Sequence, residues 1–224
     1  MLRPERIIEI IRSLEADIVC LQEVVDAPLA GARFNQASEI AQAMGEYAIC
    51  FGTNRPLYRG NYGNMTLTRF PLDAWKNHDV SHKQREERGV LQADISIDPN
   101  SSLHVFNVHL GTGYIERRAQ AERLLSAEVL GQDLRGPRLV IGDFNEWTRG
   151  LVTKMLRSSF RTFSPKHGLK FPRTFPGMLP ILSLDHYYYE APLKLETARL
   201  WRNRKTLVAS DHLPLVADFQ VGDD

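Results

Sequence analysis

Strand-length segments follow one another in pairs and threes along this chain, and only a few helices separate them. In the first half these segments are Tyr47–Phe51, Asn64–Thr68, Val90–Ile97 and Leu103–Leu110. Strict strand–helix alternation and a Gly-x-Gly-x-x-Gly motif are both absent, which argues against a Rossmann arrangement. The pattern predicts an α/β fold of the α+β type, with two mixed β-sheets packed face to face and helices on the outside.

Hydrophobic spacing places the remaining elements. The expected helices cover residues 4–15, Phe34 to Met44, Ile115 to Leu130 and Leu151 to Leu156. The expected later strands are Leu139–Ile141, Leu184–Tyr189, Leu195–Leu200 and Val216–Val221. The run Asp17–Val24 is nearly all apolar, so it should be an interior strand covered on both faces. Residues 157–183, rich in Pro, Lys, Arg and Phe, are expected to form a long active-site loop.

Composition sets broad limits on the protein. Its 224 residues suit one domain over residues 1–224, and no stable protein partner is implied, so we expect a monomer. The net charge of +1 provides no global field that attracts nucleic acid or anionic lipid. Without a signal peptide or a run long enough to span a bilayer, the sequence favours the cytoplasm. Cys20 and Cys50 lie in apolar runs and should be buried free thiols.

Polar residues capable of chemistry end several of these runs. Glu23 follows a buried strand, where a carboxylate is costly unless a cation or a donor satisfies it. Mg²⁺ takes such hard oxygen ligands, although a strand-end glutamate considered alone more commonly faces solvent. Asp143 and Asn145 share a face after another strand, where they could serve proton transfer and phosphate binding or merely form an Asx turn.

Two histidines add to this pattern. Asp211 and His212 are adjacent, so in extended backbone their side chains diverge, one toward a metal and the other toward a phosphate. Asp185 could orient His212 by accepting its second ring proton. His109 is a second imidazole at a strand end beside Asn107, where a structural role is the common alternative.

Five motifs occur in a fixed order: Leu-Gln-Glu at 21–23, Asn-Val-His-Leu at 107–110, Gly-Asp-Phe-Asn at 142–145, Leu-Asp-His at 184–186 and Ser-Asp-His-Leu-Pro at 210–214. Together they resemble the endonuclease/exonuclease/phosphatase superfamily with its deoxyribonuclease I-like fold. The resemblance covers nearly the whole chain. It implies hydrolysis of phosphodiesters or phosphomonoesters with Mg²⁺ or Mn²⁺ as cofactor.

The resemblance also implies individual roles. Glu23 would be the metal ligand, with Asp211 near the metal. Asp143 would activate or position the attacking water, Asn145 would orient the phosphate, and Asp185 would pair with His212. His212 and His109 would contact the scissile phosphate. A weaker likeness places Asn64 and Arg88 on the substrate-binding cleft, together with Asn107.

One departure concerns the start of the chain. Family members open with a strand that ends in a metal-site asparagine, whereas here a helix begins at Pro4. We expect that upstream residues are missing, which would weaken the cytoplasmic prediction and leave the chain less stable, less soluble and a weaker binder of Mg²⁺. The alternative is a weak or inactive phosphate-binding member.

The substrate class stays open at this point. His109 in Asn-Val-His resembles nonspecific nucleases and sphingomyelinase-like lipid phosphodiesterases, which favours diesters of nucleic acid, lipid or a small molecule. Near-zero net charge lowers the expectation of tight duplex binding. Trp147 could stack a base at the cleft, although packing is its more common role.

Overall fold

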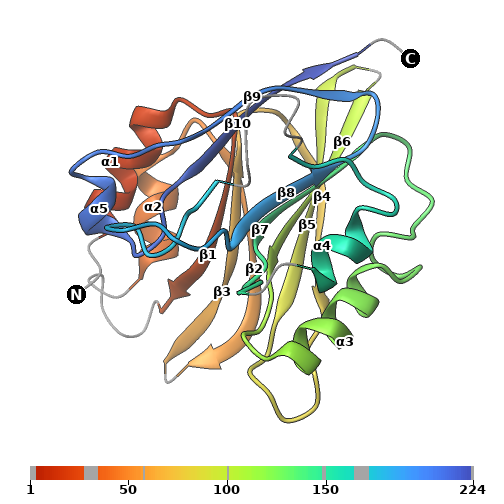
Figure 1. The fold of residues 1–224 in the computed structure, drawn as a ribbon. Helices are drawn as coiled ribbons and strands as arrows, with labels where there is room; N and C mark the ends of the chain where they lie inside the picture. Colours follow the sequence, from red (N-terminus) through yellow and green to blue (C-terminus); the bar gives the residue numbers. More distant parts are fainter. Residues whose placement is uncertain are drawn as a thin grey trace.

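A computed structural model describes residues 4–27, 35–57, 59–99, 101–147, 150–163 and 172–222 (Figure 1). The elements, in chain order, are α1 (Pro4–Leu14), β1 (Ile18–Asp26), α2 (Gln36–Ala43), β2 (Ala48–Leu57), β3 (Gly60–Thr68), β4 (Leu72–Asp79), β5 (Gly89–Asp98), β6 (Ser101–His109), α3 (Tyr114–Leu124), β7 (Arg138–Asp143), α4 (Leu151–Leu156), β8 (Asp185–Tyr189), β9 (Leu193–Leu200), α5 (Thr206–Ala209) and β10 (Leu215–Val221).

The strands form three sheets in two layers. One layer is a five-stranded sheet of order β4-β5-β6-β7-β8, in which only β6 and β7 are parallel. The other layer holds an antiparallel sheet β1-β3-β2 and an antiparallel pair β10-β9. Apolar side chains such as Val105 and Tyr187 of the large sheet share one core with Cys50 of β2 and Phe219 of β10. The expected sandwich is confirmed, although only the five-stranded sheet is mixed.

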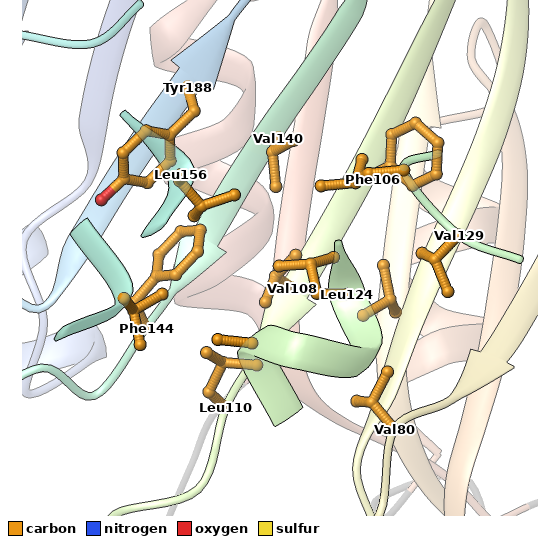
Figure 2. Packing of buried hydrophobic residues seen from close by; sticks show 14 of the residues in the cluster. Val80, Phe106, Val108, Leu110, Leu124, Val129, Val140, Phe144, Leu156 and Tyr188 are labelled. Atoms are coloured by element: carbon orange, nitrogen blue, oxygen red, sulfur yellow. The ribbon is translucent and has the colours of Figure 1, made fainter. Parts of the chain in front are cut away.

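Helices cover the outer faces of both layers. On the five-stranded sheet, Phe106 and Val140 pack against Leu124 of α3 and Leu156 of α4 (Figure 2). A separate cluster joins α1 and α2 to the outer face of β1-β3-β2, and its members include Ile8, Ile11, Ile40, Met44, Met65 and Leu67. Strand β6 therefore alternates as predicted, since Val105 faces the inter-sheet core and Phe106 faces the helices.

Several predicted boundaries were wrong. Strand β4 was not predicted because most of its side chains are exposed or half-buried, so it lacks an apolar stripe. Helix α3 ends at Leu124 rather than Leu130, although Val129 and Leu130 still pack into the core and extend the apparent helical pattern. The four-residue α5 was missed. Helix α2 begins at Gln36, and Phe34 lies outside the described residues.

Strand β1 differs from its predicted interior position. Within the described residues it pairs only with β3, so its other side is a sheet edge. A cavity of about 1750 Å³ separates this edge from β10, and we call that part of the cavity the trench. Ile18 and Cys20 line one wall, Val216 lines the other, and Leu139 and Ile141 of β7 lie between them. Much of the apolar surface of β1 and β10 is consequently only half-buried.

The structure also bears on the predictions for the two cysteines and for membrane-spanning segments. Cys20 and Cys50 are free thiols on strands that flank β3, both opposite Thr66, and only Cys50 is fully buried. Among the helices that the structure describes, none has the length and apolar character to cross a bilayer.

Candidate active site

The predicted catalytic side chains converge on one cleft. Glu23, His109, Asp143, Asn145, Asp185, Asp211 and His212 all line the cavity that continues into the trench. The register of the five-stranded sheet explains the convergence, because His109 lies beside Asp143 in the parallel pair and Asp143 lies beside Asp185 in the next, antiparallel pair. Three neighbouring strands thus carry their polar residues to the same end of the five-stranded sheet.

Local backbone features direct some of these residues into the cleft. Glu23 has φ of 62° at the irregularity where the register of β1 against β3 shifts between Leu21 and Val24. Glu23 therefore lies within β1 rather than at its end as predicted, and a bulge of this kind re-aims its side chain. Gly142 has φ of 143°, and a Cβ there would lie 2.0 Å from the Val108 carbonyl oxygen, so only glycine fits between β6 and β7.

His109 is held as a neutral donor. Its Nδ1 lies 3.2 Å from Nη1 of Arg88, and a guanidinium can only donate, so Nδ1 accepts and the ring proton resides on Nε2. Burial, together with the positive charge of Arg88, lowers the pKa of His109 to about 3. Nε2 lies 3.7 Å from Asp143 Oδ2 and 4.0 Å from Glu23 Oε1, so its proton faces the cleft.

Asp143 is a buried carboxyl group poised near neutral pH. Its Oδ1 accepts a 2.7 Å hydrogen bond from the backbone N–H of Asn145, so the Asx turn forms within the site. Burial and the nearby Asp185 carboxylate raise the pKa of Asp143 to about 7. The Asn145 side chain donates to the Leu110 carbonyl oxygen at 2.9 Å, which fixes its amide beside Asp143.

The predicted pair of Asp185 and His212 is present. Nδ1 of His212 lies 2.8 Å from Asp185 Oδ2. Burial disfavours the imidazolium, but the hydrogen bond to Asp185 and the surrounding carboxylates outweigh it and raise the pKa of His212 to about 9. Phe175 packs 5.0 Å from the His212 ring, and Trp147 packs edge-on against Phe175. Trp147 therefore has a packing partner at the cleft.

The remaining predicted residues occupy different positions. Asp211 is exposed on the cavity wall, and its carbonyl oxygen accepts a 2.6 Å bond from Gly177 N. Arg88 is 6% exposed and lies behind His109, where it also pairs with Glu86 at 2.7 Å. Because its guanidinium is engaged by His109 and Glu86, Arg88 orients His109 in this arrangement.

Asn64 and Asn107 lie behind the cleft surface, and both are completely buried. Asn107 Nδ2 donates to the carbonyl oxygens of Leu21 and Met65, while its Oδ1 accepts from Gln22 at 2.7 Å. Asn64 Nδ2 donates to the Gly89 and Asn107 carbonyl oxygens. The substrate-binding roles expected for these two residues do not fit this placement, because their amide groups join the two sheets instead.

Replacing Asn107 by alanine should therefore lower the free energy of unfolding by roughly 2–4 kcal/mol, because two buried carbonyl groups lose their donor. Urea denaturation of the variant measures this loss. Asn203→Ala is a suitable control, since its exposed side chain only caps α5 and should cost about 1 kcal/mol or less. Equal losses of unfolding free energy in the two variants would contradict the inference that Asn107 joins the two sheets.

Sequence reasoning missed one residue of the site. Tyr62 on β3 lies near Glu23, and burial together with the negative charge of the Glu23 carboxylate raises the pKa of the Tyr62 phenol. The guanidinium of Arg55 lies 4.7 Å from the centre of the Tyr62 ring. Nothing in the local sequence distinguishes Tyr62 from other strand tyrosines, since its role depends on the β1–β3 pairing.

The donor atoms of the cleft suit a hard divalent cation. In the described ranges no three His, Cys, Asp or Glu side chains form a ready-made metal cluster. Mg²⁺, however, commonly uses only one or two protein carboxylates together with water and substrate phosphate. Glu23 is 63% exposed at its side chain, and Asp143 is buried close to Asp185, so a cation between these groups would offset repulsion among carboxylates.

Comparisons with known proteins agree with this architecture. The profile of the Endonuclease/Exonuclease/phosphatase family matches residues 1–212. The uncharacterized protein YbhP of Escherichia coli K12 is 36% identical over an alignment of 228 positions, which covers 94% of this chain and 86% of that protein. A UPF0294 protein of Vibrio parahaemolyticus is 28% identical over 62% of this chain and 47% of its own length.

Solved structures share the fold at low sequence identity. An endonuclease/exonuclease/phosphatase from Bacteroides vulgatus has a TM-score of 0.77 at 17% identity, covering 98% of this chain and 90% of that one. A mannosyl-6-phosphatase from Bacteroides thetaiotaomicron has a TM-score of 0.76 at 15% identity, with 97% and 90% covered. The human nocturnin catalytic domain has a TM-score of 0.72 at 23% identity, with 97% and 85% covered. By its sequence and its fold, this chain belongs to the endonuclease/exonuclease/phosphatase family of phosphoester hydrolases.

Proposed function

We propose that the protein hydrolyses phosphodiesters with the help of Mg²⁺ or Mn²⁺. The observation that carries this proposal is the pairing, in one cleft, of a carboxyl group poised near neutral pH with a protonated imidazole. Asp143 is the carboxyl group, and His212, held by Asp185, is the imidazole. Family membership supports the phosphoester chemistry. The mannosyl-6-phosphatase and the sulfate-containing nocturnin domain share the fold and are compatible with a phosphate-binding cleft.

The proposed mechanism is in-line attack of water on phosphorus. Asp143 takes a proton from the water as the new O–P bond forms and the bond to the leaving oxygen breaks. His212 and the Nε2–H of His109 donate hydrogen bonds to the phosphoryl oxygens, where negative charge accumulates. Asn145 positions the phosphate beside Asp143. Glu23 and Asp211 would hold the cation, which when bound neutralises charge on the phosphate and the leaving oxygen.

Removal of divalent cations should abolish turnover. We expect the protein to hydrolyse bis-(4-nitrophenyl) phosphate in Mg²⁺, to lose that activity in excess EDTA, and to regain it when Mg²⁺ is restored. Activity that persists in EDTA would exclude the metal-assisted mechanism. If the protein binds a phosphodiester but turns over neither this ester nor plasmid DNA, the alternative of a phosphate-binding member would replace the hydrolase.

The pH dependence follows from the same two groups. Activity should rise as Asp143 ionises near pH 7 and fall as His212 loses its proton near pH 9. Asp185 raises the pKa of both groups, so Asp185→Asn should move both limbs of the profile to lower pH. Measurement of kcat against pH tests this expectation. An alkaline limb that stays in place in Asp185→Asn would show that His212 does not produce it.

A further inference from the structure

Exposed apolar side chains are concentrated at the mouth of the cleft. The described part of the chain has nine large exposed hydrophobic residues: Trp75, Tyr114, Ile115, Trp147, Met178, Leu179, Ile181, Val208 and Val221. Trp75 on β4 does not line the cavity, and Val221 lines its trench at the end of β10. The other seven belong to four segments, namely the start of α3, the segment between β7 and α4, the loop before β8, and α5. Four of the seven line the cavity themselves: Trp147, Met178, Leu179 and Val208. We call these seven residues the apolar rim.

Two parts of the rim lie close in sequence to residues of the cleft. Ile115 is the second residue of α3 and follows Thr112, which lines the cavity. Met178 and Leu179 line the cavity themselves and follow Phe175, whose ring contacts His212. Ile115, Met178 and Leu179 are 73%, 78% and 72% exposed, respectively. Aliphatic side chains so fully exposed gain little from stacking on a base, but they gain free energy when an apolar phase removes them from water.

Positive charge adjoins this rim. Arg202 donates a 3.0 Å hydrogen bond from Nη2 to the Met178 carbonyl oxygen, which ties the basic segment Arg202–Lys205 to the apolar loop. Lys205 pairs with Glu9, whereas Arg202 and Arg204 are exposed and form no salt bridge in the described ranges. In Figure 1 the α5 region and the loop before β8 lie side by side. An apolar surface flanked by arginines suits an anionic bilayer.

We propose that the apolar rim docks on the surface of anionic phospholipid membranes and presents the cleft to phosphodiesters of lipid headgroups. This inference rests on the proposed function, because it names the substrate class of the same site. Three exposed side chains on two separate segments would enter the interface, and the arginines beside them would approach the anionic headgroups. The phosphodiester of a bound lipid would then lie close to His212 and Asp143 without leaving the bilayer.

Vesicle sedimentation in EDTA tests docking without hydrolysis. We expect the wild type to sediment with vesicles of phosphatidylcholine and phosphatidylglycerol, and more weakly with phosphatidylcholine alone. The triple variant Ile115→Ser/Met178→Ser/Leu179→Ser should show at least a tenfold lower partition coefficient on both vesicles. Ile115→Ser alone should give a partial loss. Arg202→Glu/Arg204→Glu should lose binding only on the anionic vesicles, and Trp75→Ser, a matched exposed residue away from the rim, should bind like the wild type.

Rates of hydrolysis in Mg²⁺ test membrane docking separately from the proposed phosphodiesterase activity. The ratio of vesicle-lipid cleavage to bis-(4-nitrophenyl) phosphate cleavage should fall at least tenfold in the triple variant and stay constant in Trp75→Ser. A wild type that cleaves the soluble ester but never sediments with vesicles would overturn the docking and leave the function intact. Sedimentation without cleavage of any diester would overturn the function and leave the docking intact. Binding of a single-stranded oligonucleotide that the arginine variant loses, with no vesicle binding, would assign the surface to nucleic acid and overturn the inference.

Discussion

Replacing His212 by alanine is expected to reduce turnover of a phosphodiester roughly 100- to 10,000-fold. The variant loses a charged donor that the Asp185 hydrogen bond holds toward the cleft, and such donors act mainly on the transition state. The fold should survive, because His212 lies at the cleft surface with a quarter of its side chain exposed. Steady-state kinetics and a thermal melt of the same preparation measure the two effects separately.

The chain contains a matched control for this experiment. His104 pairs with Asp94 at 2.7 Å through Nδ1, much as His212 pairs with Asp185 at 2.8 Å. His104, however, lies on β6 in register with Arg138, while the cleft residue His109 lies at the other end of the strand beside Asp143. His104→Ala should therefore destabilise the protein but keep kcat within about twofold. A comparable loss of turnover in both variants would mean that any broken His–Asp pair disturbs the site, and the catalytic role of His212 would have to be abandoned.

A strand placed in the trench is expected to raise the thermal midpoint by roughly 10 °C. Each buried apolar side chain contributes about 1.5–3 kcal/mol, and ordering the backbone costs about 1–2 kcal/mol per residue, so a short strand should leave a net gain of a few kcal/mol. For a protein of this size each kcal/mol shifts the midpoint by about 2–4 °C. The trench is suited to a strand because β1 and β10, which line it, are edge strands. In the described residues the outer side of each has no hydrogen-bonded neighbouring strand.

The test compares the 224-residue chain with a form extended upstream by an apolar strand that ends in asparagine. Because the family resemblance assigns that asparagine to the metal site, the midpoint shift caused by Mg²⁺ should also be larger in the extended form. The same extension with a central proline is the control, since proline cannot complete the hydrogen-bond ladder of an interior strand. Equal midpoints and equal Mg²⁺ shifts in all three proteins would show that the trench accepts no strand.

Local sequence patterns correctly predicted the structural features that depend on residues adjacent in the chain. The alternation from Leu103 to Leu110 correctly placed Val105 and Phe106 on opposite faces of β6. Helical spacing likewise predicted a helix over residues 4–15, and α1 covers Pro4–Leu14. These predictions succeed because the side-chain period is a property of a few consecutive residues.

Predictions failed where the structure of a segment depends on contacts with residues far away in the sequence. The polar strand β4 is stabilised by its ladder with β5, so its own sequence carries little strand signal. Asn107 resembles a cleft residue because it lies two positions before His109 in the sequence. Its side-chain amide, however, forms hydrogen bonds with Leu21, Met65 and Gln22 from other strands. The trench along β1 likewise depends on which strands pair, because an apolar run looks the same whether one edge or both are covered.

The candidate site shows the same division. Motif order and strand-end position identified the acids and histidines of the cleft, including the partnership of Asp185 with His212. Their protonation could not be read from the sequence. His109 is neutral, His212 is charged and Asp143 titrates near neutral pH because burial and neighbouring charges shift each pKa differently. Those neighbours are set by the packing of β6, β7 and β8, so identical residue types acquire different chemistry only after the chain has folded.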